Sequence, residues 1–126
     1  MPDNLKDILV VDDEKEIRDL LKDCLEENHF NVLLAVDGIK ALELIEERPP
    51  GLVIVDLLLP GEHGINLIKT VKEKYFIPVI IVSGVYRQEE VSDFMEEYSV
   101  EGFLEKPIDL NKLLEKIHQA VNAGTV

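Results

Sequence analysis

Polar side chains that could bind a metal ion or act as a nucleophile stand directly after the short apolar runs of this sequence. They are Asp12, Asp13 and Glu14 after the first run, Asp56 at the end of the third, Ser83 at the end of the fourth and Lys106 after the fifth. If the runs are parallel strands of one sheet, these groups converge where the strands' carboxyl ends meet. Carboxylates brought that close repel one another unless they are protonated or bind a cation. Because Mg²⁺ takes such oxygen ligands together with waters and phosphate oxygens, a magnesium site is predicted there.

Each residue taken alone also has a simpler interpretation. Asp12 and Asp13 could cap the first helix, and a strand-end Asp56 is typical of a turn. Ser83 alone would be expected to hydrogen-bond the backbone, and Lys106 alone to lie in solvent. Their joint placement favours chemistry, in which the carboxylate of Asp56 attacks as a nucleophile and gives an aspartyl phosphate. A metal, an ammonium and a hydroxyl would neutralise the oxygens of the transferred group.

The elements that must position these groups are indicated by the apolar patterning. Residues 8–11, 52–55 and 79–82 are unbroken apolar runs rich in β-branched side chains, as in parallel strands buried on both faces. Residues 31–35 and 102–105 are weaker runs that suit the edges of a sheet.

Apolar residues at helical spacing separate the strands. They are Ile17, Leu20, Leu21, Cys24 and Leu25, then Ile65, Ile68 and Val71, then Val91, Phe94, Met95 and Tyr98, and finally Leu110, Leu113, Leu114, Ile117 and Val121. The pattern over residues 38–47 predicts a shorter helix. Asp109 is placed to cap the first turn of the last predicted helix. This alternation gives parallel strands with right-handed crossovers. The predicted fold is therefore α/β, a flavodoxin-like doubly wound (βα)5 three-layer fold whose parallel five-stranded sheet has the order 2-1-3-4-5.

The length and net charge of the chain limit the number of domains and the kinds of partner that it can bind. The 126 residues, 14.3 kDa, suit one domain over 1–126, with a core at about 6–121 and short frayed termini. A net charge of −13 argues against direct binding to nucleic acid or to an anionic membrane. No apolar run approaches the roughly 18 residues of a membrane helix, so a cytoplasmic protein is expected. The single cysteine, Cys24, is predicted to be a small core residue in a reducing compartment rather than a reactive thiol.

Together these motifs resemble the receiver domains of two-component response regulators. The resemblance is carried by residues 8–14, 55–60 with Gly64, Ser83 with Gly84, and 102–107, and it extends over about 6–121. It implies that Asp56 accepts a phosphoryl group from a histidine kinase or a histidine phosphotransfer protein. It also implies that the protein is a signalling switch and not an enzyme, although it would assist its own Mg²⁺-dependent phosphorylation and dephosphorylation.

The resemblance further implies a ligand set for the metal. Asp13 and Asp56 would ligate Mg²⁺ directly, together with the backbone carbonyl of Leu58, whereas Asp12 would act mainly through a bound water. Lys106 would pair with Asp56 and then with the phosphoryl oxygens. The bond between Lys106 and Pro107 is often cis in this family.

A switch is implied as well. Ser83 would move to hydrogen-bond the phosphate, and Phe103 would turn inward as Ser83 shifts, although Phe103 could also be an ordinary core residue. The surface that changes would be formed by the fourth helix, the fifth strand and the fifth helix, where it could serve homodimerisation or an effector. Its candidate contacts are Tyr86, Tyr98, Phe103 and Ile108.

Some positions depart from the family's pattern. Leu59 stands where Met is common, a change that conserves volume. Residues 98–101 lack the usual pair of small residues, which affects the expected packing of the fourth helix. Leu58 and Val85 occupy the positions that tune phosphoryl lifetime, and because neither can orient an attacking water, a long-lived phosphoryl group is predicted.

Three other functions fit these residues less well. A flavin-binding redox protein would need a small, hydroxyl-rich phosphate loop after the first strand, where the acidic residues 12–14 would instead repel phosphate. A degenerate receiver, acting as a phosphorylation-independent interaction module, usually lacks an acidic residue or the lysine, and here both are present. A phosphate-ester hydrolase would need a second acid or base beside Asp56. The histidine in that neighbourhood, His63, is expected to be solvated.

Overall fold

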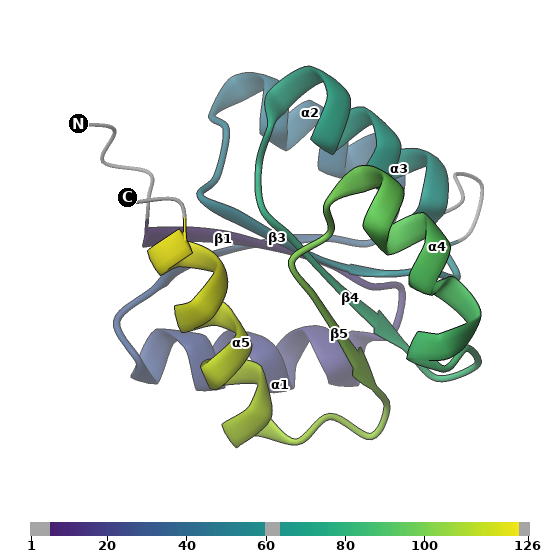
Figure 1. The fold of residues 1–126 in the computed structure, drawn as a ribbon. Coiled ribbons are helices and arrows are strands. Elements are labelled where there is room, and N and C mark those ends of the chain that lie inside the picture. Colours follow the sequence, from purple (N-terminus) through teal and green to yellow (C-terminus); the bar gives the residue numbers. More distant parts are fainter. Residues whose placement is uncertain (1–5, 60–63, 124–126) are drawn as a thin grey trace.

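A parallel sheet and the helices on its two sides make up the computed structural model, which describes residues 6–59 and 64–123 (Figure 1). The strands are β1 (Asp7–Val11), β2 (Asn31–Ala35), β3 (Leu52–Asp56), β4 (Val79–Ser83) and β5 (Gly102–Glu105). The helices are α1 (Lys15–Glu27), α2 (Gly38–Glu47), α3 (Gly64–Thr70), α4 (Gln88–Tyr98) and α5 (Leu110–Ala123), and a π-helical turn, η2 (Val71–Tyr75), continues α3. The strand order is β2-β1-β3-β4-β5, which confirms the predicted fold, with β2 and β5 at the edges.

The side chains of each central strand alternate between two cores. Ile8 and Val10 of β1 pack with α1 and α5 on one side of the sheet, where Leu21 and Leu113 are fully buried. Leu9 belongs to the second core, on the side of α2, α3 and α4. Figure 1 shows these two groups of helices on opposite sides of the sheet. Burial on both faces explains why the strands read as unbroken apolar runs.

Side-chain caps begin two of the helices. Asp37 accepts a hydrogen bond from the Lys40 amide at 2.8 Å at the start of α2. Asp109 accepts from the amides of Asn111 and Lys112, at 2.9 and 3.2 Å, at the start of α5. The predicted role of Asp109 is confirmed. These bonds satisfy amides that have no partner within their own helix.

Local details differ from the predictions. Helix α5 continues to Ala123, two residues past the predicted core boundary at residue 121. Cys24 is half-buried rather than in the core, since it lies at the flank of the buried stripe of α1. The third helix ends in the π-helical turn η2, after which Phe76 takes a left-handed conformation with φ 57°.

Some residues named in the sequence predictions lie outside the residues that the structure describes. Pro60 and His63, and the chain ends 1–5 and 124–126 that were expected to fray, are not among the described residues. Within the described ranges, no helix has the length and apolar character needed to cross a membrane.

Candidate functional site

The strand register brings the polar residues to one edge of the sheet. Val11 of β1 pairs with Val55 of β3, so the next residue along β3, Asp56, is level with Asp12. Asp56 in turn pairs with Val82, which places Ser83 one step further out on β4. Polar side chains thus stand at the carboxyl ends of three neighbouring strands, at the same edge of the sheet, as predicted from the sequence.

Lys106 forms ion pairs with three carboxylates of this site. It follows β5, and its amide donates to the Ser83 carbonyl at 2.8 Å. Its ammonium nitrogen lies 3.0 Å from Asp12 Oδ2, 3.0 Å from Asp56 Oδ2 and 3.1 Å from Glu14 Oε1. Burial alone would lower the pKa of the Lys106 ammonium, but the hydrogen bonds to these three carboxylates outweigh it and raise that pKa above its usual range. Lys106 is therefore a fixed positive charge over the site. The bond to Pro107 is cis, as the family resemblance implies.

Asp12 is held by both its backbone and its side chain. Burial raises the pKa of its carboxyl, whereas the bonds from the Glu14 amide and Lys106 lower it, with a net rise. The Glu14 amide donates to Asp12 Oδ1 at 2.9 Å, and Arg18 Nη1 of α1 donates to the Asp12 carbonyl at 2.8 Å. These contacts fix the turn between β1 and α1 that carries the acidic run.

Asp56 has its two carboxylate oxygens oriented by different partners. Oδ1 accepts from the Leu58 amide at 3.0 Å, and Oδ2 faces the Lys106 ammonium at 3.0 Å. Asp56 is only 5% exposed, so its surroundings leave it little freedom to turn away. Beside it, the Gly64 amide at the start of α3 donates to the Leu57 carbonyl at 3.1 Å, which closes the loop after β3.

The acidic residues also fit a divalent cation. Asp12, Asp13, Glu14 and Asp56 each offer one carboxylate oxygen, and these four atoms lie within 4.8 Å of one another. An octahedral Mg²⁺ site with bonds of about 2.1 Å has ligand oxygens no more than about 4.2 Å apart, so the spacing of the cluster is close to what this ion needs. The hard oxygen donors suit Mg²⁺ rather than a soft metal. The expected role of the Leu58 carbonyl stays a prediction.

Ser83 is buried and already bonded. Its Oγ accepts hydrogen bonds from the amides of Val85 at 3.2 Å and Tyr86 at 2.9 Å, in the loop between β4 and α4. The hydroxyl is therefore used as an acceptor that holds this loop. Any movement of Ser83 toward Asp56 is coupled to the loop through these two bonds.

Phe103 is a largely buried residue of β5. It is 4% exposed and belongs to the same apolar cluster as Ile81 and Val91. Its ring packs with these residues of β4 and α4, and its expected part in the surface of α4, β5 and α5 stays a prediction. In the same structure the Ser83 hydroxyl accepts from the loop amides, and the coupled movement of Ser83 and Phe103 stays a prediction.

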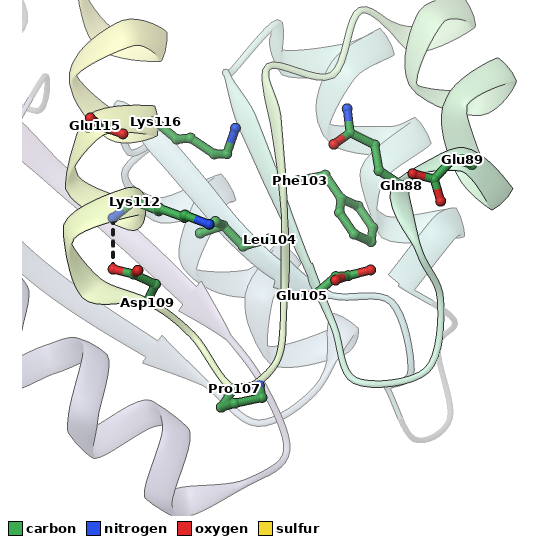
Figure 2. A pocket seen from close by; sticks show the side chains of 10 residues that line it. All are labelled: Gln88, Glu89, Phe103, Leu104, Glu105, Pro107, Asp109, Lys112, Glu115 and Lys116. Carbon is green, nitrogen blue, oxygen red and sulfur yellow. Dashed lines mark hydrogen bonds between the residues drawn. The ribbon is translucent and has the colours of Figure 1, made fainter.

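The face formed by α4, β5 and α5 carries a groove of about 550 Å³. Figure 2 shows the Phe103 ring beside Gln88 and Glu89 on the α4 side of β5, and Lys112 and Lys116 on the α5 side; all of them line the groove. Of the predicted contacts on this face, Tyr86 is 38% exposed, and Tyr98 and Ile108 are partly buried.

Two contacts at the site were missed from the sequence. Arg18 anchors the Asp12 carbonyl, and the Glu14 side chain joins the Lys106 ammonium. Both lie at the start of α1, one helical turn apart, a spacing that puts them on the same face next to the acidic turn. That spacing is the only signal in the sequence that could have pointed to them.

Known proteins resemble this chain over nearly its whole length. The family model of the response regulator receiver domain matches residues 8–118. NtrX from Brucella abortus is 32% identical with a TM-score of 0.84, and the match covers 93% of this chain but 27% of NtrX. A CheY-like response regulator receiver domain protein from Methanospirillum hungatei JF-1 is 31% identical, with a TM-score of 0.83 and coverage of 93% and 94%. The receiver domain of a Francisella response regulator is 28% identical, with a TM-score of 0.85 and coverage of 94% and 98%.

Proposed function

The chain belongs to the response regulator receiver domain family, and on that premise we propose that it is a phosphoacceptor signalling switch whose acceptor is Asp56. The single observation that carries the proposal is the bridge of the Lys106 ammonium between the buried carboxylates of Asp12 and Asp56. An ammonium placed 3.0 Å from the acceptor oxygen can neutralise charge that develops on a transferred phosphoryl group.

The reaction is a direct transfer from a phosphorylated histidine of a kinase or phosphotransfer protein. A carboxylate oxygen of Asp56 attacks the phosphorus, a P–O bond forms, and the P–N bond breaks. The electron pair of that bond stays on the imidazole nitrogen of the donor, which then takes up a proton. Asp12, Asp13, Asp56 and the Leu58 carbonyl would hold a Mg²⁺, which supplies charge neutralisation of the phosphoryl oxygens when bound. The same arrangement assists hydrolysis, in which water replaces Asp56 on the phosphorus.

Signalling then depends on a change in the loop after β4. A phosphoryl group on Asp56 offers new acceptor oxygens to the Ser83 hydroxyl, and Ser83 carries the Val85 and Tyr86 amides with it. The loop leads into α4, so its movement alters the face of α4, β5 and α5, where an effector or a second copy would bind. Phe103 acts as the apolar floor against which α4 repacks.

The wider context is part of the same proposal. Residues 1–126 form one receiver domain in the cytoplasm, and it binds neither nucleic acid nor membrane directly, in keeping with its net charge of −13. Receiver domains are signalling domains rather than conventional enzymes. The function is tested by asking whether a phosphodonor with Mg²⁺ places one phosphoryl group on Asp56 and on no other residue.

The phosphorylated protein should lose its phosphoryl group slowly, and Leu58→Asn should speed that loss by about tenfold. Leu58 is 45% exposed beside Asp56 but offers no polar side-chain atom, so it cannot orient the attacking water. An amide at this position can do so. Because it orients the water without taking its proton, the expected gain lies below the roughly 10²- to 10⁴-fold that a general acid or base typically contributes. The measurement is the decay of the phosphorylated species after the donor is removed, at fixed Mg²⁺.

The matched control is Val36→Asn. Val36 is 47% exposed, follows β2 instead of β3, and should leave the decay rate unchanged. A Leu58→Asn protein that decays no faster than wild type contradicts the explanation of lifetime by this position.

A further inference from the structure

Glu14 contacts the site without having a part in the function proposed above. It is the N-cap residue of α1, and its carboxylate remains 57% exposed at the rim of the acidic cluster. Its Oε1 lies 3.1 Å from the Lys106 ammonium nitrogen, 92 residues away in the sequence. The Glu14 side chain therefore spans from the first helix to the loop after β5.

The contact with Glu14 gives the Lys106 ammonium a third hydrogen-bond acceptor. A lysine ammonium has three N–H donors. Three carboxylate oxygens surround that of Lys106 at 3.0 to 3.1 Å, one each from Asp12, Asp56 and Glu14. Asp12 and Asp56 are buried. Glu14 is exposed, and its oxygen contacts the ammonium from the solvent side.

We propose that Glu14 is a positioning residue that acts through Lys106. It holds the ammonium over Asp56, so that when the acceptor becomes phosphorylated one hydrogen bond passes from Asp56 to a phosphoryl oxygen while the bonds to Asp12 and Glu14 stay in place. Without Glu14, the long lysine side chain regains rotamer freedom on its solvent side. The inference rests on the proposed function, which it deepens.

Two effects of Glu14 oppose each other and must be separated. Its negative charge repels an anionic phosphodonor, whereas its oxygen positions Lys106. Glu14→Gln removes the charge but keeps an acceptor oxygen at the same place. Glu14→Ala removes both, so the difference between the two variants isolates positioning from charge.

The first measurement is the rate of phosphorylation by acetyl phosphate at saturating Mg²⁺. The Gln variant should react as fast as wild type or somewhat faster. The Ala variant should react about tenfold more slowly than the Gln variant, the scale of one hydrogen bond to a charged group. Glu16 gives the matched control, because it is exposed in the first turn of α1 and carries the same charge. Glu16→Gln and Glu16→Ala should react at equal rates.

A second measurement does not depend on phosphorylation. The ¹H–¹⁵N NMR signal of the Lys106 ammonium should be observable in wild type and in Glu14→Gln, because all three of its hydrogens are bonded. It should broaden through exchange with water in Glu14→Ala and persist in both Glu16 variants. If no variant is phosphorylated but this pattern is seen, the proposed function fails while the contact between Glu14 and Lys106 stands.

Two results overturn the positioning role. Equal phosphorylation rates for Glu14→Gln and Glu14→Ala would mean that only charge matters at this position. A loss of Mg²⁺ affinity beyond about 100-fold in both Glu14 variants, measured by calorimetry against the Glu16 variants, exceeds what a residue outside the ligand set typically causes and would make Glu14 a metal ligand instead.

Discussion

Lys106→Met should lower the free energy of unfolding by about 3 kcal/mol when divalent cations are absent. The substitution leaves the buried carboxylates of Asp12 and Asp56 without the cation that lies 3.0 Å from each. Uncompensated buried charges are costly because water no longer screens them. The measurement is urea denaturation of wild type and variant, with and without Mg²⁺.

Millimolar Mg²⁺ should recover much of this loss, because it would neutralise the same carboxylates and bind only the folded state. Lys15→Met is the matched control. Lys15 pairs with Asp19 on the surface of α1, where the two side chains are 78% and 52% exposed, and its loss should cost less than about 1 kcal/mol. A Lys106→Met protein as stable as wild type without Mg²⁺ would mean that the ammonium does not balance the acidic site.

Gly64→Ala should cost about 3 kcal/mol and slow phosphorylation. A Cβ at Gly64 would lie 2.7 Å from both the Cα and the carbonyl oxygen of Leu57, and closer still to the carbonyl oxygen of Asp56. All three are backbone atoms, which cannot turn aside, so either α3 or the end of β3 must shift. Because Asp56 ends β3, the shift displaces the acceptor itself. Thermal or urea unfolding gives the stability, and the phosphorylation rate gives the effect on the site.

Gly84→Ala provides the comparison for Gly64→Ala at the same edge of the sheet. Its Cβ would meet only the Lys106 side chain, at 3.5 and 3.7 Å, which is ordinary van der Waals contact. Stability should change by less than about 0.5 kcal/mol. If both alanine variants are equally stable, the close approach of α3 to β3 is not what positions Asp56.

The convergence of the site could be predicted because it depends on where strands end. A residue directly after a buried parallel strand must lie at the carboxyl edge, whatever its rotamer. Asp12, Asp56 and Lys106 lie where this argument predicts, whereas the ion pair of Lys106 with Asp56 was expected from the family resemblance. The same holds for Asp109, whose capping role is a matter of local backbone geometry.

The contacts that were missed depend on side-chain direction and on packing. Whether Glu14 reaches Lys106, or whether Ser83 turns toward its own loop, depends on rotamers chosen by neighbours far away in sequence. The burial of Phe103 depends on how closely α4 packs on the sheet, and the half-exposure of Cys24 on the roll of α1. Apolar periodicity gives the buried face of a helix but not its exact roll.

The central claim is that Asp56 is the phosphoacceptor, and the mass of the intact protein after incubation with acetyl phosphate tests it most directly. Wild type with Mg²⁺ should gain one phosphoryl group, and it should gain none when the metal is chelated. Asp56→Asn, which keeps the volume and the oxygen that accepts from the Leu58 amide, should gain none in either condition. An adduct that persists in Asp56→Asn, or that forms equally without Mg²⁺, would contradict the account. A folded wild-type protein that gains no phosphoryl group would instead favour a phosphorylation-independent interaction module.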